Sequence, residues 1–150
     1  MEESSSDIYV KWHKKTFARF LAVQVAYSRN FVCYKTTTEL NDYIKEIIHV
    51  LKYQNYDHEF LDGLCQKIIN DNTESDKIIE SCLNENWSLS RINLSSLSIL
   101  RVAICEWTNY DTPVPVIINE YTNISSSLVE KSSEVNFISG LLNKVKYIQF

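Results

Sequence analysis

The segment that most constrains the fold lies at residues 91–107. Its large apolar side chains recur at helical spacing and others fill the flanks; the spaced set is Leu97, Leu100, Ile104 and Trp107. A helix that is apolar around its whole circumference is buried among other helices. The sequence therefore predicts a central helix that ends near Asn109, with the remaining helices arranged on it.

Two charged residues, Arg101 and Glu106, lie inside this apolar segment. A buried charge is costly unless it is paired and hydrogen-bonded. We therefore expect both charges to be satisfied internally, with Arg101 paired to Glu106 or Glu120. Glu120 and its neighbour Asn119 follow an apolar run, so they are expected to brace the central helix or, alternatively, to bind the backbone of a partner.

The rest of the chain also indicates an all-α fold. Its 150 residues contain only 2 Gly and 2 Pro, whereas an all-β chain needs many tight turns. Amphipathic spacing and capping residues predict about seven helices joined by short connections. The expected helix starts are near residues 10–12, at Thr36, within 55–57, at 71–73, near 91, at Thr112 followed by Pro113, and at Ser132 or Ser133.

The expected domain organisation is a flexible tail at 1–11 and a single domain at 12–150. The polar stretch 84–93 is the predicted seam between subdomains at about 12–84 and 91–148, with Trp87 as a packing anchor between them. Gly63 and Gly140 each fall in the middle of a predicted helix, where glycine costs about 1 kcal/mol relative to Ala. Close helix packing is the expected reason for both.

A row of basic residues is the main sign of a binding surface. Lys11, Lys15 and Arg19 follow one another at i+4 spacing, with Lys14 beside them. Like charges at this spacing destabilise a helix by about 0.2–0.5 kcal/mol per pair, and a bound phosphate backbone would compensate them. The simpler alternative is a solvated face, and the net charge of −4 argues mildly against a nucleic-acid module.

The motifs give little support for catalysis. There is no glycine-rich phosphate loop, and the three histidines lack metal-ligand spacing. On a helix, His58 and Cys65 would lie roughly 10 Å apart, too far for direct proton transfer. We expect no enzymatic activity, no cofactor and no metal.

The cysteines and the apolar runs indicate the compartment. Cys33, Cys65, Cys82 and Cys105 are expected to be buried, reduced thiols. Neither a secretory signal nor a membrane-spanning run is found, so a cytoplasmic protein is expected.

Five segments resemble, in the same order and at similar spacing, motifs of the NusB transcription antitermination family. They are 17–27 (FARFLAVQVAY, like ARExAVQALY), 61–64 (LDGL), 100–106 (LRVAICE, like LRIAxYE), 112–120 (TPVPVIINE, like VPxxVAINE) and 137–144 (FISGLLNK, like FVNGVLDK). The resemblance extends from about residue 12 to 146. It implies two helical bundles packed across each other and no enzymatic activity.

The resemblance also implies a function and partners. Family members bind a short single-stranded boxA sequence in ribosomal RNA leaders, as a heterodimer with a small-subunit ribosomal protein, NusE. This heterodimer joins other Nus factors on RNA polymerase and suppresses termination. Lys15 and Arg19 fall on basic positions of the family's first helix, Tyr27 on its tyrosine, and Phe137 on an aromatic near bound RNA.

The expected RNA-binding residues are therefore Lys11, Lys14, Lys15, Arg19, Tyr27 and Phe137. The chain also departs from the family pattern, because Thr16 and Phe17 stand where arginines are common, and Phe20, Ser133 and Asn136 replace other charged residues. These losses keep open a second hypothesis, a protein-interaction scaffold without direct RNA contact. A third is an RNA-binding appendage like those of some ribosomal RNA methyltransferases.

Overall fold

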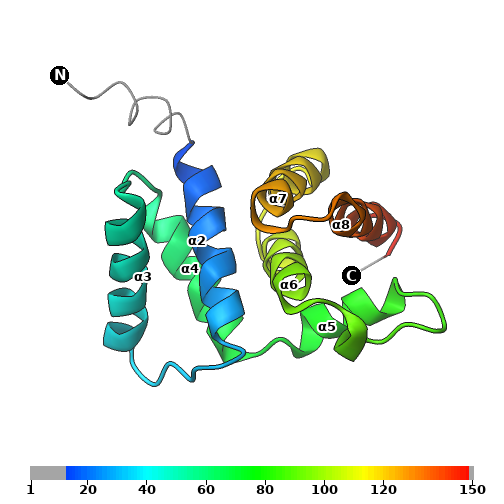
Figure 1. The fold of residues 1–150 in the computed structure, drawn as a ribbon, viewed down its shortest axis with the longest axis horizontal. Helices are drawn as coiled ribbons and strands as arrows, with labels where there is room; N and C mark the ends of the chain where they lie inside the picture. Colours follow the sequence, from blue (N-terminus) through cyan, green and yellow to red (C-terminus); the bar gives the residue numbers. More distant parts are fainter. Residues whose placement is uncertain (1–12, 149–150) are drawn as a thin grey trace.

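The computed structural model describes residues 13–148, and within that range the chain is entirely helical (Figure 1). Its elements are α2 (Lys14–Ser28), α3 (Thr37–Leu51), α4 (His58–Asn70), α5 (Thr73–Ser81), the 3-10 turn η1 (Leu89–Arg91), α6 (Leu94–Asn109), α7 (Val114–Leu128) and α8 (Ser132–Val145). These seven α-helices confirm the predicted all-α class for the described residues. The predicted tail, including Lys11, lies outside them.

The helices form two groups that meet along α2 and α6 (Figure 1). Helices α2, α3 and α4 lie side by side, and α6, α7 and α8 form the second group. Helix α5, which the sequence analysis placed in the first subdomain, packs against α6, α8 and η1 instead. Every helix in residues 13–148 is too short or too polar to cross a lipid bilayer.

Helix α6 is the central helix that the sequence predicts. It contacts α2, α4, α5, α7 and α8. Six of its apolar side chains are at most 5% exposed, namely Leu97, Ile99, Leu100, Val102, Ala103 and Ile104. Their burial contributes to the hydrophobic stabilisation at about 25 cal/mol per Å² of apolar surface removed from water.

Two of the predicted helix caps are confirmed. The Thr36 hydroxyl accepts from the Glu39 N–H at 3.1 Å, and the Asp57 carboxylate accepts from the Phe60 N–H at 3.0 Å. Each satisfies a backbone donor that has no partner within the helix.

Two other predicted caps are wrong. Pro113 and Lys131 are the N-cap residues of α7 and α8, in place of Thr112 and Ser132 or Ser133. Thr112 instead donates its hydroxyl to the Glu106 carboxylate at 2.7 Å. A side chain with a charged acceptor within reach forms a stronger hydrogen bond than a cap to a neutral N–H would.

The two mid-helix glycines have different surroundings. A Cβ atom built on Gly63 would collide with the hydroxyl of Tyr110, so the predicted close packing is confirmed there. A Cβ atom on Gly140 would meet nothing within 4 Å, so the same prediction is wrong for α8. Gly140 faces open space, not a neighbouring helix.

We expect alanine substitutions at the two glycines to change the free energy of unfolding in opposite directions. Gly140→Ala should stabilise the protein by up to about 1 kcal/mol, because it gains helix propensity without a clash. Gly63→Ala should destabilise it by about 1–2 kcal/mol through overpacking against Tyr110. Urea unfolding of both variants measures the difference, and adding Tyr110→Phe should recover part of the loss at Gly63. A loss of stability in Gly140→Ala would contradict the finding that residue 140 faces open space.

Candidate nucleic-acid interface

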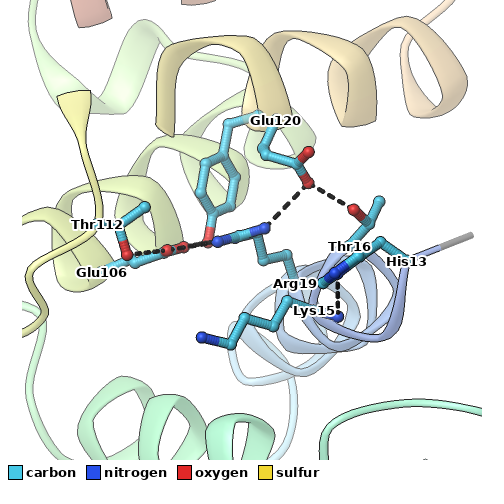
Figure 2. Close-up of polar contacts among 8 residues, drawn as sticks. His13, Lys15, Thr16, Arg19, Glu106, Thr112 and Glu120 are labelled. Carbon is cyan, nitrogen blue, oxygen red and sulfur yellow. Dashed lines mark hydrogen bonds and ion pairs between the residues drawn. The ribbon is translucent and has the colours of Figure 1, made fainter. Parts of the chain in front are cut away.

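Arg19, the last cation of the predicted basic row, lies in the protein interior (Figure 2). Its Nε and Nη2 donate to the two carboxylate oxygens of Glu106, each at 2.8 Å, and its Nη1 donates to Glu120 at 3.1 Å. Arg19 is 4% exposed and Glu106 is fully buried. The expectation that Arg19 points outward and unpaired is therefore wrong.

Three hydroxyl groups complete this network, which we call the Arg19 network and which contains Arg19, Glu106, Glu120, Tyr121, Thr112 and Thr16. The Tyr121 and Thr112 hydroxyls each donate to Glu106 at 2.7 Å. The Thr16 hydroxyl donates to Glu120 at 2.8 Å. Since the residues come from α2, α6, α7 and the connection before α7, the network ties the first helix group to the second.

Arg101 does not take the partners that were expected for it. It donates to the Asp76 carboxylate at 2.9 and 3.1 Å and to the Asn30 side-chain oxygen at 3.2 Å. The pairing with Glu106 or Glu120 is wrong because Arg19 occupies both carboxylates. Arg101 instead holds α5 and the end of α2 against α6.

The Arg19 network keeps its charges although they are buried. Burial alone would lower the pKa of Arg19, but hydrogen bonding and attraction to Glu106 raise it above the ordinary value. Burial alone would raise the pKa of Glu106, yet Arg19 and the hydroxyls of Tyr121 and Thr112 hold it below its ordinary value of 4.5. Burial and the neighbouring Glu106 raise the pKa of Tyr121 well above 10.0, so its hydroxyl remains a donor.

The lowered pKa of Glu106 predicts a stability that depends on pH. A carboxyl whose folded pKa is depressed stabilises the fold above its unfolded pKa, and this contribution disappears as the pH falls through the folded value. Glu106→Gln should cost about 3 kcal/mol at pH 7. The difference from the original protein should narrow below about pH 5, as the unfolded chain binds its proton. Denaturant unfolding of both proteins across pH 3–8 measures this difference in unfolding free energy.

Glu59→Gln is the matched control, since Glu59 is an exposed carboxylate of α4. It should change the unfolding free energy by less than about 0.5 kcal/mol at every pH. A pH-independent difference for Glu106→Gln would show that the Glu106 charge contributes nothing to the fold.

Lys14 and Lys15 are the cations of the predicted row that remain exposed. They occupy the first turn of α2, whose N-cap His13 accepts from the Lys15 N–H at 3.1 Å. The Nζ of Lys15 lies 5.2 Å from the centroid of the Phe60 ring. Within residues 13–148, neither ammonium group belongs to an ion pair.

Two positions that carry arginine in the family pattern contribute no charge here. Thr16 uses its hydroxyl within the Arg19 network. Phe17 is 2% exposed and lies edge-on to Tyr53, with ring centroids 4.6 Å apart. The cationic surface at the start of α2 is therefore small.

The predicted aromatic contacts, Tyr27 and Phe137, lie on other parts of the structure than the first turn of α2. Tyr27 is 38% exposed and packs edge-on against Phe31, with ring centroids 5.4 Å apart. It lies at the other end of α2, roughly 18 Å from Lys15 along the helix axis. Phe137 is half-buried on α8, in the second helix group. The described residues of the predicted set therefore lie at the two ends of α2 and on α8.

Trp87 lies beside Phe137 and Arg91 lies over Trp87, and the sequence analysis selected neither of them as a binding residue. Trp87 is 46% exposed and stacks on Phe137 with centroids 6.1 Å apart. The Arg91 guanidinium lies 5.4 Å from the centroid of the Trp87 ring. Trp87 was expected between the two halves, whereas it packs on α8. Its position in a polar stretch, four residues before an arginine, was the available signal.

Cys65 and Cys105 lack the thiolate character that a reactive cysteine needs. All four are free, with Cys65 and Cys82 buried, Cys105 half-buried and Cys33 exposed, so the expectation of burial is wrong for Cys33. Burial raises the pKa of Cys65 to about 12 and that of Cys105 to about 11. Both thiols are therefore protonated at neutral pH.

The fold and this surface define a class of protein: a small all-helical protein with exposed lysines at the start of one helix and partly exposed aromatic rings at the other end of that helix and on a second helix. Comparison with protein families identifies it further. The NusB family matches residues 16–147. The chain belongs to the NusB family.

Individual relatives agree with this assignment. The transcription antitermination protein NusB of Bartonella tribocorum is 28% identical over 138 residues, which cover 89% of this chain and 88% of that protein. The NusB protein of Rickettsia bellii is 28% identical over 152 aligned positions, covering 91% and 92%. That of Elusimicrobium minutum is 32% identical over 110 residues, covering 72% and 76%.

Proposed function

We propose that the protein is an RNA-binding transcription antitermination factor. It binds a boxA-like single-stranded RNA of a ribosomal RNA leader as a heterodimer with the small-subunit ribosomal protein NusE. Through this complex it joins other Nus factors and RNA polymerase. The observation that carries the proposal is the pair of exposed lysines, Lys14 and Lys15, at the start of α2 in a chain of the NusB family.

The mechanism consists of binding alone. Lys14 and Lys15 neutralise phosphates and release counterions. Tyr27 and Phe137 present ring surface to unpaired bases, and each stacked base contributes about 1–3 kcal/mol. Lys11 is a further candidate and lies outside the described residues. Arg19 acts by holding α2 against α6 and α7, which fixes where the lysines point.

A second candidate function is a protein-interaction scaffold without direct RNA contact. The burial of Arg19 favours it, because one of the predicted phosphate contacts is occupied by Glu106 and Glu120. The net charge of −4 also favours it. The two candidates differ in whether RNA binding depends on this chain's own lysines.

Replacing both lysines tests the proposal. Lys14→Ala/Lys15→Ala should weaken binding of boxA-like RNA to the NusE heterodimer. It should also make the slope of log K against log salt shallower by about 1.4, at about 0.7 per phosphate contact on a single strand. Fluorescence anisotropy titrations between low and physiological salt measure both effects. The unfolding free energy should stay unchanged, because both side chains are exposed.

Lys45→Ala/Lys77→Ala is the matched control, since it removes the same charge from exposed positions on α3 and α5. Equal losses of RNA affinity in the two double variants would indicate a general effect of positive charge. Affinity that survives in the Lys14/Lys15 variant would favour the scaffold. Arg19→Ala is unsuitable, because leaving the buried Glu106 unpaired should destabilise the fold by about 3–5 kcal/mol.

A further inference from the structure

A groove runs between α7 and α8, which are neighbours joined by only three residues, 129–131. It has a volume of about 640 Å³, and its lining comes from residues 114–122 of α7 and 139–146 of α8. Each stretch is about 10–12 Å long at 1.5 Å per helical residue. An extended peptide rises about 3.3 Å per residue, so the groove accommodates about three or four residues of one. The lining contains none of the residues to which the proposed function assigns RNA contacts.

The start of α7 forms the apolar part of the groove. Val114 and Ile118 are half-buried there and Pro115 is exposed. They are not the side chains that attach α7 to the core, which are Ile117, Tyr121 and Ile124. Helix α7 therefore presents a second apolar surface, and an apolar side chain of a partner would be buried against it.

Two polar side chains of α7 in the groove lack a partner within residues 13–148. The hydroxyl oxygen of Thr122 is buried without a hydrogen bond, although a helical threonine can donate to a carbonyl one turn back. Rotation about χ1 exchanges this hydroxyl with the methyl group and so turns it toward a ligand. The Asn119 amide is exposed and forms no hydrogen bond with the described residues. Its donors and its acceptor match the C=O and N–H groups of an extended peptide.

The charge at the groove is positive. Lys146 lines it at the end of α8, is exposed, and forms no ion pair with any residue of 13–148. None of the lining residues is acidic. The carboxylate of Glu120, next to Asn119 in the chain, is held by Arg19 and Thr16. The groove is therefore complementary to a segment that carries an acidic side chain close to an apolar one.

The same features disfavour a nucleic acid as the occupant. Single-stranded nucleic acids stack their bases on aromatic rings, and the lining of this groove includes no aromatic residue. One ammonium group neutralises one phosphate, whereas a strand carries a phosphate on every nucleotide. Apolar side chains beside groups that pair with a peptide backbone are instead the usual means of recognising an extended peptide.

We propose that the α7–α8 groove docks an extended, acidic segment of a protein partner additional to the NusE of the proposed heterodimer. An apolar side chain of the segment lies on Val114, Pro115 and Ile118. The Asn119 amide pairs with its backbone, and its carboxylate contacts Lys146. The inference goes beyond the proposed function, since it requires neither RNA nor the lysines of α2.

Selection of peptides on the purified protein is the direct test. The probe is a phage-displayed library of random peptides of about seven residues, which exceeds the length of the groove. Selection on the original protein with counter-selection on Asn143→Trp should enrich segments that have an apolar residue close to Asp or Glu. Asn143 is exposed at the rim, so a tryptophan there covers the groove and leaves the core intact. By calorimetry, a synthetic peptide of the enriched sequence should bind Asn143→Trp at least about tenfold more weakly than the original.

Two smaller changes test the assigned contacts. Lys146→Glu should change the selected peptides from acidic to basic. The peptide selected on the original protein should bind this variant about 3- to 10-fold more weakly, because an attraction becomes a repulsion. Asn119→Ala should weaken that peptide about 2- to 10-fold, which is the loss of one hydrogen bond to its backbone, and should leave the acidic preference unchanged.

Matched controls carry the same substitutions outside the groove. Asn123→Trp adds the same side chain as Asn143→Trp to an exposed position of α7, and Lys131→Glu reverses an exposed charge just before α8. Both should bind the peptide within about twofold of the original protein. Circular dichroism of each variant checks that the helices are intact.

The outcomes separate a further protein partner from other occupants. No enrichment, peptides that bind Asn143→Trp as well as the original, or an unaltered charge preference on Lys146→Glu would overturn the inference. Weakened RNA binding by the Asn143→Trp heterodimer would make the groove part of the RNA path, and weakened NusE binding would make it part of the heterodimer interface. A dimer of the original protein that Asn143→Trp abolishes would make it a self-association surface. Each of these three results also overturns the inference, and none decides the test of Lys14→Ala/Lys15→Ala.

Discussion

The arrangement of the two helix groups depends on one buried ion pair, between Arg19 of α2 and Glu106 of α6. The pair is bidentate, and Glu120 of α7 and three hydroxyl groups complete its hydrogen bonding. A buried carboxylate with this many donors stays charged, and a buried guanidinium with two carboxylates does the same. Apolar packing brings α2 and α6 together, but the ion pair specifies which faces meet, since any other register would leave a charge unpaired in the interior.

This constraint also shapes the surface that is available for the RNA binding we propose. Because Arg19 is turned inward, the start of α2 presents only Lys14 and Lys15 among the described members of the predicted basic row. The second helix group presents a different chemistry, an aromatic groove at Trp87 and Phe137. Lys14, Lys15 and Tyr27 lie on α2 and Phe137 lies on α8, so a single RNA strand that contacts all of them, as we propose, crosses from one helix group to the other. That arrangement suits a protein that acts together with a partner.

Local features were predictable because their causes are local. The apolar circumference of α6 and the caps at Thr36 and Asp57 depend only on residues close in the chain. The errors in charge pairing involve distant partners. Arg19 has the i+4 spacing of an exposed basic row, yet its partners Glu106 and Glu120 come from the other half of the chain. Gly63 and Gly140 look alike in sequence and differ only in whether Tyr110 or open space faces them.

The sequence by itself determined the all-helical class, the central helix and the likeness to the NusB family, since periodicity, capping and motif order are written along the chain. Only the tertiary structure decided which charged side chains are exposed and unpaired, and so available to a ligand. It turned Arg19 inward, paired Arg101 with Asp76, and left Trp87 exposed beside the open face of Gly140. The physical reason is that burial and pairing depend on what lies across the interface, and helical spacing carries no information about it.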